Sequence, residues 1–253
     1  LLIHGFGASS EHWRKNAIEF ATAGFCVFAI DLIGFGKSDQ PNSIQFRYLD
    51  NLIWAEQVIQ FIEEIINSNK FRKVSLIGNS LGSLVALTSL SLRPDLINSI
   101  IASPLPDPAL IQNIASPQPS WIQKPKKYLI KLFFFLLPLE IIIPLIIKSR
   151  FINFALQLAY VRPISADKEL KQIVTIPAKR PTAAKALRSM CIGMSLRPKW
   201  SIAPILLKEI PIKISDPKIL LIWGRKDKLV PLSLAKRLIK QHPWLKLLVI
   251  ENS

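Results

Sequence analysis

Residues that commonly build metal sites and disulfides are scarce in this chain of 253 residues, which has two cysteines and three histidines. Cys26 and Cys191 lie far apart in apolar surroundings, with no C-x-x-C pair, so we expect buried, reduced thiols and no disulfide. His4, His12 and His242 form no pair at helical spacing with an acidic partner, so no metal site is indicated. The sequence predicts neither a metal nor a cofactor.

A nucleotide-binding loop and a readable leader are also missing. The segment 31–39 has two glycines but fits neither G-x-x-x-x-G-K-[ST] nor G-x-G-x-x-G, which argues against nucleotide binding. The chain starts at Leu1 and not at Met, so no targeting segment can be read and we expect the natural N-terminus to lie upstream. Half of the residues are apolar, which is enough for one large core with an inserted subdomain.

Acidic residues are rare between residues 117 and 213, where seventeen Lys and Arg stand against four acids and contribute +13 of the total charge of +16. Nucleic acid is not an expected partner, because Phe133 to Phe135 cluster in an apolar run and are not interleaved with basic residues. The basic residues instead bracket apolar runs: Lys124, Lys126, Lys127 and Lys131 precede 132–137, and Lys148 and Arg150 follow 141–147.

The apolar stretch from 132 to 147 is not expected to cross a bilayer, since a spanning helix needs about 20 apolar residues. Pro138, Pro144 and Glu140 interrupt this stretch as well. Basic flanks around an apolar segment favour peripheral contact with a membrane surface. The alternative is that these residues line the underside of a cap. Both interpretations favour a hydrophobic small-molecule substrate.

A G-x-S-x-G sequence stands between two apolar runs at residues 73–87. Val74 to Ile77 is typical of a strand, and Leu81, Leu84, Val85 and Thr88 recur at helical spacing behind it. The pattern predicts a strand, a sharp strained turn with Ser80 at its tip, and a helix, which together form a nucleophile elbow. The Leu81 N–H, at the positive end of that helix, is a candidate oxyanion donor.

The second oxyanion donor is expected in the glycine-rich loop after the strand at residues 1–3. When an H-G-x-G loop lies beside the elbow strand, the N–H of its third residue, here Phe6, points at the position that the Leu81 N–H also serves. We expect His4 to brace this loop through its ring nitrogens and not to act as a base.

Two aspartates are candidates for the acid of a catalytic triad. Asp227 follows the strand expected at 219–223, from where a carboxylate can orient a histidine. Asp107, after the strand expected at 97–102, is the alternative. His242 lies between a helix at 232–241 and a strand at 245–250, so we place it at the sheet edge opposite the elbow and expect it to interact with the helix dipole.

Strands and helices alternate along the chain. A strand is expected at Cys26 to Ile30, and a helix capped by Asp50 extends to Ile66. The alternation predicts an α/β fold with a mainly parallel sheet, helices on both faces and an inserted helical cap. The expected division is core 1–103, cap 104–213 and core 214–253.

Four loops together resemble the successive signatures of the α/β-hydrolase superfamily. They are His4-Gly5-Phe6-Gly7, the loop 31–39, Gly78-Asn79-Ser80-Leu81-Gly82 and Trp223-Gly224-Arg225-Lys226-Asp227. The resemblance implies the order serine, acid, histidine, with the histidine in the loop after the last strand. We therefore expect the catalytic histidine just past Ser253, and the 253 residues alone to be inactive. The serine at the elbow argues against membership in the haloalkane dehalogenases or the epoxide hydrolases, because those enzymes have an aspartate at this position.

The resemblance implies a serine hydrolase that cleaves an ester of a large hydrophobic substrate through an acyl-enzyme, without a cofactor. The G-N-S-L-G form and Asp39 are similar to chlorophyll-processing hydrolases such as pheophytinase and chlorophyll dephytylase of cyanobacteria and plastids. This likeness implies a cytoplasmic or stromal location, peripheral to a membrane. The sequence is also similar to carbon–carbon bond hydrolases of aromatic degradation. A non-catalytic binding protein and a membrane-anchored structural protein on the same fold remain as alternatives.

Overall fold

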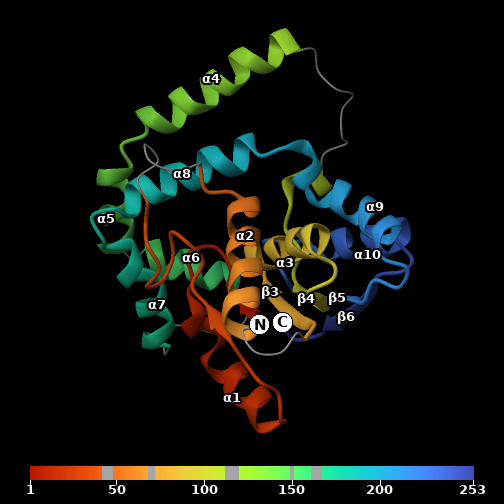
Figure 1. Cartoon of the computed structure of the whole chain (residues 1–253). Coiled ribbons are helices and arrows are strands. Elements are labelled where there is room, and N and C mark those ends of the chain that lie inside the picture. The colour runs from red at the N-terminus through yellow and green to blue at the C-terminus, as the bar shows by residue number, and fades with distance from the viewer. Residues whose placement is uncertain (42–47, 68–71, 112–119, 149–150, 161–166) are drawn as a thin grey trace.

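The chain builds one parallel sheet, seen in a computed structural model that describes residues 1–41, 48–67, 72–111, 120–148, 151–160 and 167–253. Six strands pair in the order β2-β1-β3-β4-β5-β6 (Figure 1). Their bounds are β1 Leu2–Ile3, β2 Ala29–Ile30, β3 Val74–Asn79, β4 Ile97–Ser103, β5 Ile219–Gly224 and β6 Lys246–Ile250. The second strand, β2, pairs with one edge of β1, and the next strand along the chain, β3, pairs with the other edge. Such a reversal of strand order opens a crevice at the carboxyl ends of the two strands, where ligands bind in sheets of this kind.

Helices surround this sheet. The longer ones are α1 Arg14–Thr22, α2 Asn51–Phe61, α3 Leu81–Leu92, α4 Ser120–Leu136, α5 Leu139–Lys148, α6 Phe151–Ala159, α7 Lys168–Ala178, α8 Ala183–Leu196, α9 Ala203–Lys213 and α10 Leu232–Gln241. The predicted α/β fold with a parallel sheet is confirmed. The helix after Pro231 begins and ends where the sequence pattern predicts it.

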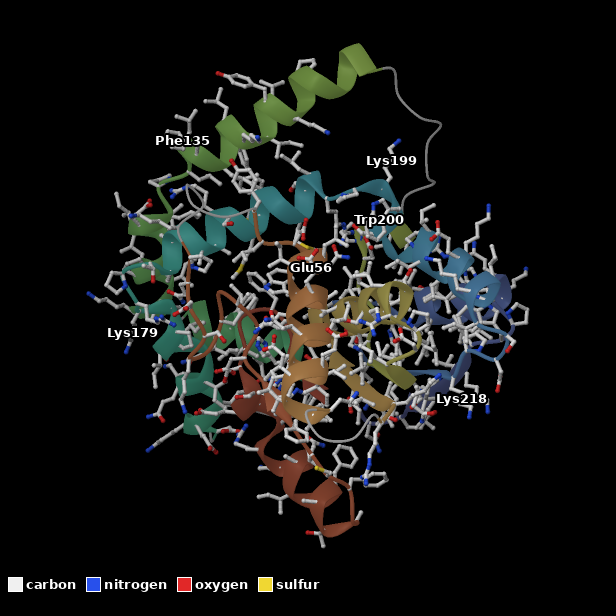
Figure 2. The ribbon with its side chains drawn as sticks, in the orientation of Figure 1. Glu56, Phe135, Lys179, Lys199, Trp200 and Lys218 are labelled. Atoms are coloured by element: carbon white, nitrogen blue, oxygen red, sulfur yellow. The ribbon has the colours of Figure 1, made fainter. Side chains whose placement is uncertain are left out.

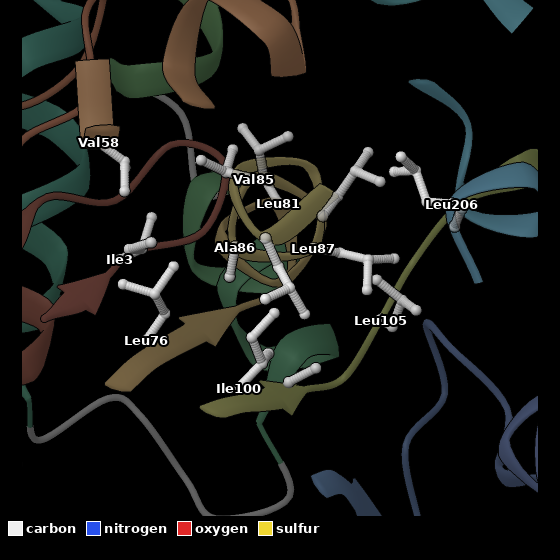
Figure 3. Packing of buried hydrophobic residues seen from close by; sticks show 14 of the residues in the cluster. Ile3, Val58, Leu76, Leu81, Val85, Ala86, Leu87, Ile100, Leu105 and Leu206 are labelled. Atoms are coloured by element: carbon white, nitrogen blue, oxygen red, sulfur yellow. The ribbon is translucent and has the colours of Figure 1, made fainter. Parts of the chain in front are cut away.

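The core lies where α3 packs against the sheet. Almost every residue of α3 is buried, because the helix contacts β3 and β4 on one side and α2 and α9 on the other. Leu76 of β3, Val85 of α3 and Ile100 of β4 meet in this core (Figure 3). A helix enclosed by both layers holds its own N-terminus rigidly, and Ser80 directly precedes that N-terminus.

The start of α2 follows the prediction. Asp50 is its N-cap, and the Asp50 side chain accepts hydrogen bonds from the N–H groups of Leu52 at 3.0 Å and Ile53 at 3.1 Å. These bonds satisfy two donors that have no partner inside the helix, which typically stabilises a helix by about 1 kcal/mol. The last turn, 62–66, is a π-helix.

The strand expected at Cys26 to Ile30 is shorter than predicted, because only Ala29–Ile30 pair with β1. The prediction that Cys26 is buried is wrong: its side chain is exposed, and Cys191 is half-buried. Both thiols are free, as expected. The physical reason is the strand order, since β2 lies at an edge of the sheet and none of the described strands covers the residues that lead into it.

The elements described between β4 and β5 are helices and short turns, with α8 crossing over the core and α4 above α8 (Figure 1). Ion pairs tie these helices to segments next to the sheet. Arg14 of α1 binds Asp167 and Glu169 at the start of α7, and Asp107 after β4 binds Arg197 after α8. The cap boundaries at 104 and 213 remain a prediction.

Among the described residues, no single helix has both the length and the apolar character needed to cross a membrane. One pair of helices, Lys127–Leu136 and Leu139–Lys148, meets that requirement only when taken together, and it is bent by 56°.

Candidate active site

Ser80 adopts the sharp turn that the G-x-S-x-G sequence predicts. Its φ of 51° and ψ of −114° make it the one non-glycine residue with positive φ in the described part of the chain. Such a conformation costs about 1–3 kcal/mol and is held only where the surroundings enforce it. Here the Ser80 N–H donates to the Ser103 carbonyl at 3.0 Å, and the Ser80 carbonyl accepts from the Ser83 N–H at 2.8 Å.

Two further side chains, which the sequence did not single out, hold this turn. The buried Ser83 hydroxyl donates to the Gly78 carbonyl at 2.8 Å and accepts from the Ser103 N–H at 3.0 Å. The Asn79 amide donates to the Ser103 carbonyl at 2.9 Å. The end of β4 therefore fixes both sides of the turn. No local signal in the sequence identifies the contacts with Ser103, because they join residues 20 and 24 positions apart.

Three glycines allow the glycine-rich loop to approach Ser80. A Cβ on Gly82 would lie 2.2 Å from the Ile3 carbonyl oxygen, and one on Gly78 would lie 2.3 Å from the Gly82 carbonyl oxygen. A Cβ on Gly5 would lie 3.2 Å from the Ser80 Cβ. The loop after β1 and the turn after β3 are therefore in contact at the reversal of strand order.

We expect Gly82→Ala to destabilise the protein by about 3 kcal/mol, the upper end of the usual cost of overpacking, because the added methyl group would meet backbone that cannot rotate away. Gly24→Ala is the matched control, since a Cβ there meets nothing within 4 Å and adds only the strain of a positive φ, about 1–2 kcal/mol. Urea unfolding of both variants measures the difference. Equal losses would show that the β1 backbone yields to the new methyl group.

His4 braces the glycine-rich loop, as predicted. Its buried ring accepts the Leu32 N–H at Nε2 over 3.0 Å, so Nδ1 carries the proton and donates to the Gly5 carbonyl at 2.7 Å. Burial lowers the pKa of the imidazole and keeps it neutral. With both ring nitrogens engaged, His4 is not available as a general base.

Asp31 connects the two loops beside the site, a role that no motif in the sequence indicates. Its carboxylate accepts the N–H groups of Ser10 at 2.6 Å and Lys37 at 2.7 Å. Burial opposes its ionisation, but these N–H groups outweigh the burial, so the pKa of Asp31 is lowered. Gly36, with a φ of 50°, leaves room for this carboxylate, which a Cβ there would meet at 2.3 Å.

Two backbone N–H groups beside Ser80 are available for an oxyanion. Phe6 follows Gly5 in the loop that contacts Ser80, and Leu81 is the first residue of α3, where the helix dipole is positive. Neither N–H has a hydrogen-bond partner among the residues described here. The side chain of Phe6 is exposed and packs edge-on against Phe35, with ring centroids 5.7 Å apart. Their role as oxyanion donors remains a prediction.

Asp227 is a half-buried carboxylate with one oxygen engaged. Its Oδ1 accepts the N–H groups of Leu229 at 2.9 Å and Val230 at 2.8 Å, while Oδ2 has no partner within the described part of the chain. The segment after β6 passes close by, because the Lys226 N–H donates to the Ser253 carbonyl at 2.8 Å. The turn thus fixes the carboxylate and leaves one oxygen for another donor.

Asp107, the alternative acid, has both oxygens engaged. The residue is only 2% exposed. Its Oδ1 accepts from the Ala109 N–H at 2.9 Å and from Arg197 Nη2 at 2.7 Å, and Oδ2 accepts from the Ala203 N–H at 2.8 Å. Asp107 therefore joins the end of β4 to the segments around α8 and α9, and both of its oxygens are already hydrogen-bonded.

The other two histidines, His242 and His12, contact neither Asp107 nor Asp227 in the described structure. His242 is the C-cap of α10 and precedes β6, as predicted. Burial lowers its pKa, and its interaction with the helix dipole remains a prediction. His12 Nε2 lies 2.8 Å from the hydroxyl of Tyr160, the residue directly after α6, while its Nδ1 is buried without a partner among the described residues. Burial also lowers the pKa of His12.

Within the described ranges, no group of three or more His, Cys, Asp or Glu side chains could hold a metal ion. The arrangement at the end of β3 is instead suited to nucleophilic chemistry. It combines a half-buried turn hydroxyl, two N–H groups without a partner among the described residues, and a carboxylate fixed in the turn after β5.

A profile for the family described as the alpha/beta hydrolase fold matches residues 1–134, more than half of the chain. The protein therefore belongs to the α/β-hydrolase-fold family. A solved structure of 2-hydroxy-6-oxo-6-phenylhexa-2,4-dienoate hydrolase from Rhodococcus sp. strain RHA1 superposes with a TM-score of 0.67 at 21% identity, covering 99% of this chain and 81% of that one. This likeness supports the fold.

Two curated proteins are similar in sequence. Epoxide hydrolase 3 of Xenopus tropicalis is 26% identical over 235 residues, which cover 90% of this chain and 58% of that protein. The probable lysophospholipase BODYGUARD 3 of Arabidopsis thaliana is 28% identical over 135 residues, which cover 52% of this chain and 24% of that protein. The chain thus spans less than two thirds of the length of either relative.

Proposed function

We propose that the protein is a serine hydrolase that cleaves an ester bond of a large hydrophobic substrate. The observation that carries the proposal is the strained Ser80 turn in contact with Gly5. Phe6 follows Gly5 and Leu81 follows Ser80, and the N–H groups of both have no partner among the described residues. A hydroxyl next to two such donors is the arrangement that acyl transfer requires.

In the proposed mechanism, Ser80 Oγ attacks the ester carbonyl carbon and gives its proton to a histidine. The N–H groups of Phe6 and Leu81 hold the negative oxygen of the tetrahedral intermediate. The carbon–oxygen bond to the alcohol then breaks, and the alcohol leaves with the proton from the histidine. Water attacks the acyl-enzyme in the same way, which releases the acid and restores Ser80.

Asp227 is proposed to orient that histidine through its unpaired Oδ2. None of the three histidines in the sequence suits the role. His4 has both ring nitrogens bonded, His12 contacts Tyr160, and His242 precedes β6. The proposal therefore requires a histidine outside these 253 residues, close to the Asp227 turn.

The class of substrate rests on the cap and on one relative. The cap exposes many large apolar side chains, and a similar protein is named a lysophospholipase. A lipid ester or a chlorophyll-related ester suits both the cap and the G-N-S-L-G sequence. Opening of an epoxide, suggested by the name of another relative, is not proposed, because Ser80 occupies the position where such enzymes carry an aspartate.

Cleavage of a carbon–carbon bond is the second candidate, since the structure of a dienoate hydrolase shares the fold. It would use the same serine and oxyanion donors, and it would need charged groups around a compact pocket to bind an acidic dienol. Turnover of the full-length protein on long-chain aryl esters and on a dienoate separates the two reactions.

We expect a fluorophosphonate probe to label the full-length protein at Ser80, because an activated serine attacks phosphorus as it attacks a carbonyl. Peptide mass spectrometry identifies the modified residue. The chain of residues 1–253 should react slowly, since the proposal assigns none of its three histidines as the base. Labelling at another serine, or no labelling of an active full-length protein, would rule out the proposed nucleophile.

A further inference from the structure

The bent helix pair, formed by residues 127–136 of α4 and 139–148 of α5, turns large apolar side chains toward solvent. Phe135, labelled in Figure 2, lies at the outer edge of the molecule on α4. The exposed side chains include Leu129, Phe133, Phe135, Leu136, Ile141 and Leu145. An apolar surface of this extent is uncommon on a soluble protein and commonly marks an interaction site.

The orientation of α4 decides between the two interpretations of its sequence. Leu129, Leu132 and Leu136 recur at helical spacing and share the outer face. The opposite face looks to the body of the protein, because α4 packs against α8 and Lys131 Nζ lies 5.3 Å from the ring centroid of Tyr48. A helix that only lined the underside of a cap would have the reverse orientation.

The bend between α4 and α5 is fixed by one side chain. Arg188 of α8 donates from Nε to the Phe134 carbonyl at 2.9 Å and from Nη2 to the Leu137 carbonyl at 2.9 Å. These carbonyls lie at the end of α4, where helix carbonyls lack partners inside the helix. The outward-facing apolar surface is therefore part of the packed cap.

Arg188 also binds the acidic residue of the bent helix pair. Its Nη1 and Nη2 donate to the Glu140 carboxylate at 2.9 and 3.0 Å. These hydrogen bonds lower the pKa of Glu140 to about 2, so the group stays ionised and paired with arginine. Because Glu140 is the one acid in 127–148, this pairing removes the main local source of repulsion toward a negatively charged surface.

We propose that the outer face of the bent helix pair docks on an anionic lipid surface. Charge complementarity supports this occupant, since residues 117–213 carry a net charge of +13 and the exposed Lys127 and Lys148 lie at the two ends of the pair. A second copy would bring two such segments face to face, and like charges oppose that contact. The 56° bend argues for a helix pair that lies in the interface.

The test is co-sedimentation of the protein with phosphatidylcholine vesicles that contain or lack phosphatidylglycerol, without any substrate, so its outcome does not depend on hydrolysis. We expect binding to the anionic vesicles, weakened but not abolished by salt, because apolar contact is insensitive to screening. A triple variant, Leu129→Gln, Phe135→Gln and Leu136→Gln, should lower the affinity about tenfold or more, since each side chain removes apolar contact.

The matched control changes three equally exposed apolar residues elsewhere, Ile18→Gln, Phe25→Gln and Ile212→Gln. Their exposures of 68, 66 and 79% compare with 61, 73 and 69% for Leu129, Phe135 and Leu136. The control should bind as the parent does, and circular dichroism checks that both variants fold.

Three results would overturn the proposal. The parent protein could fail to bind anionic vesicles at low salt, the two triple variants could lose equal affinity for these vesicles, or the parent could bind neutral vesicles as well as anionic ones. A dimer in gel filtration that only the first triple variant dissociates would assign the face to a second copy and would also overturn it.

Discussion

Replacing Ser80 by alanine is expected to abolish ester hydrolysis by the full-length protein, with a loss on the order of 10⁴- to 10⁶-fold in kcat. The hydroxyl is the proposed attacking group, and no neighbouring side chain can form the acyl-enzyme in its place. Steady-state kinetics on a long-chain aryl ester measures the loss. Stability should change little, because alanine at a φ of 51° carries the same backbone strain as serine.

Ser75→Ala is the matched control for this prediction. Ser75 lies on the same strand, β3, at the end away from the turn, and its exposed hydroxyl contacts only neighbouring polar side chains such as Ser99 at 2.8 Å. Its removal should leave kcat and KM unchanged. If Ser80→Ala kept more than a residual rate while Ser75→Ala behaved as the parent, the serine mechanism would be wrong and water would have to attack directly.

The sequence predicts local backbone structure well where short-range geometry dictates the residue. The turn at Ser80 needs small neighbours on both sides, so the glycines at positions 78 and 82 predict this turn from the sequence. A helix start needs an acceptor, and Asp50 provides one. Such requirements involve residues a few positions apart, and a pattern in the sequence can therefore reveal them.

Contacts between distant segments are not predictable in this way. The exposure of Cys26 follows from the place of β2 at the sheet edge, which no local pattern encodes. The bend after α4 is held by Arg188, a residue 54 positions after Phe134. The amphipathic pattern of α4 is visible in the sequence, but it does not tell which face meets the protein.

The same limit explains why the sequence left Asp107 and Asp227 as alternatives. Both follow strands of the sheet, and their difference lies in their partners. Arg197, 90 positions away, and the Ala203 N–H occupy Asp107, whereas Asp227 bonds only to its own turn and keeps one oxygen unpaired in the described structure. This contrast supports Asp227 as the acid that orients the histidine.

Asp227→Asn is expected to lower kcat by about 10⁴-fold while KM stays near its parent value. The asparagine carbonyl can still accept the N–H groups of Leu229 and Val230, which keeps the turn intact. Its NH₂ group would then replace Oδ2 and present a donor to the histidine. A donor favours the tautomer in which the wrong ring nitrogen carries the proton. Stopped assays at several pH values measure kcat and KM.

Asp107→Asn serves as the contrasting variant. Its loss of charge leaves Arg197 buried without a counter-ion, which typically costs about 3–5 kcal/mol in stability, so urea unfolding should detect it. The fraction that remains folded should keep its kcat, because Asp107 holds the cap and does not reach the histidine in the proposed mechanism. A near-normal kcat for Asp227→Asn would contradict the assignment even if Asp107→Asn failed to fold. The acid would then have to be sought at Asp107, where β4 meets the cap.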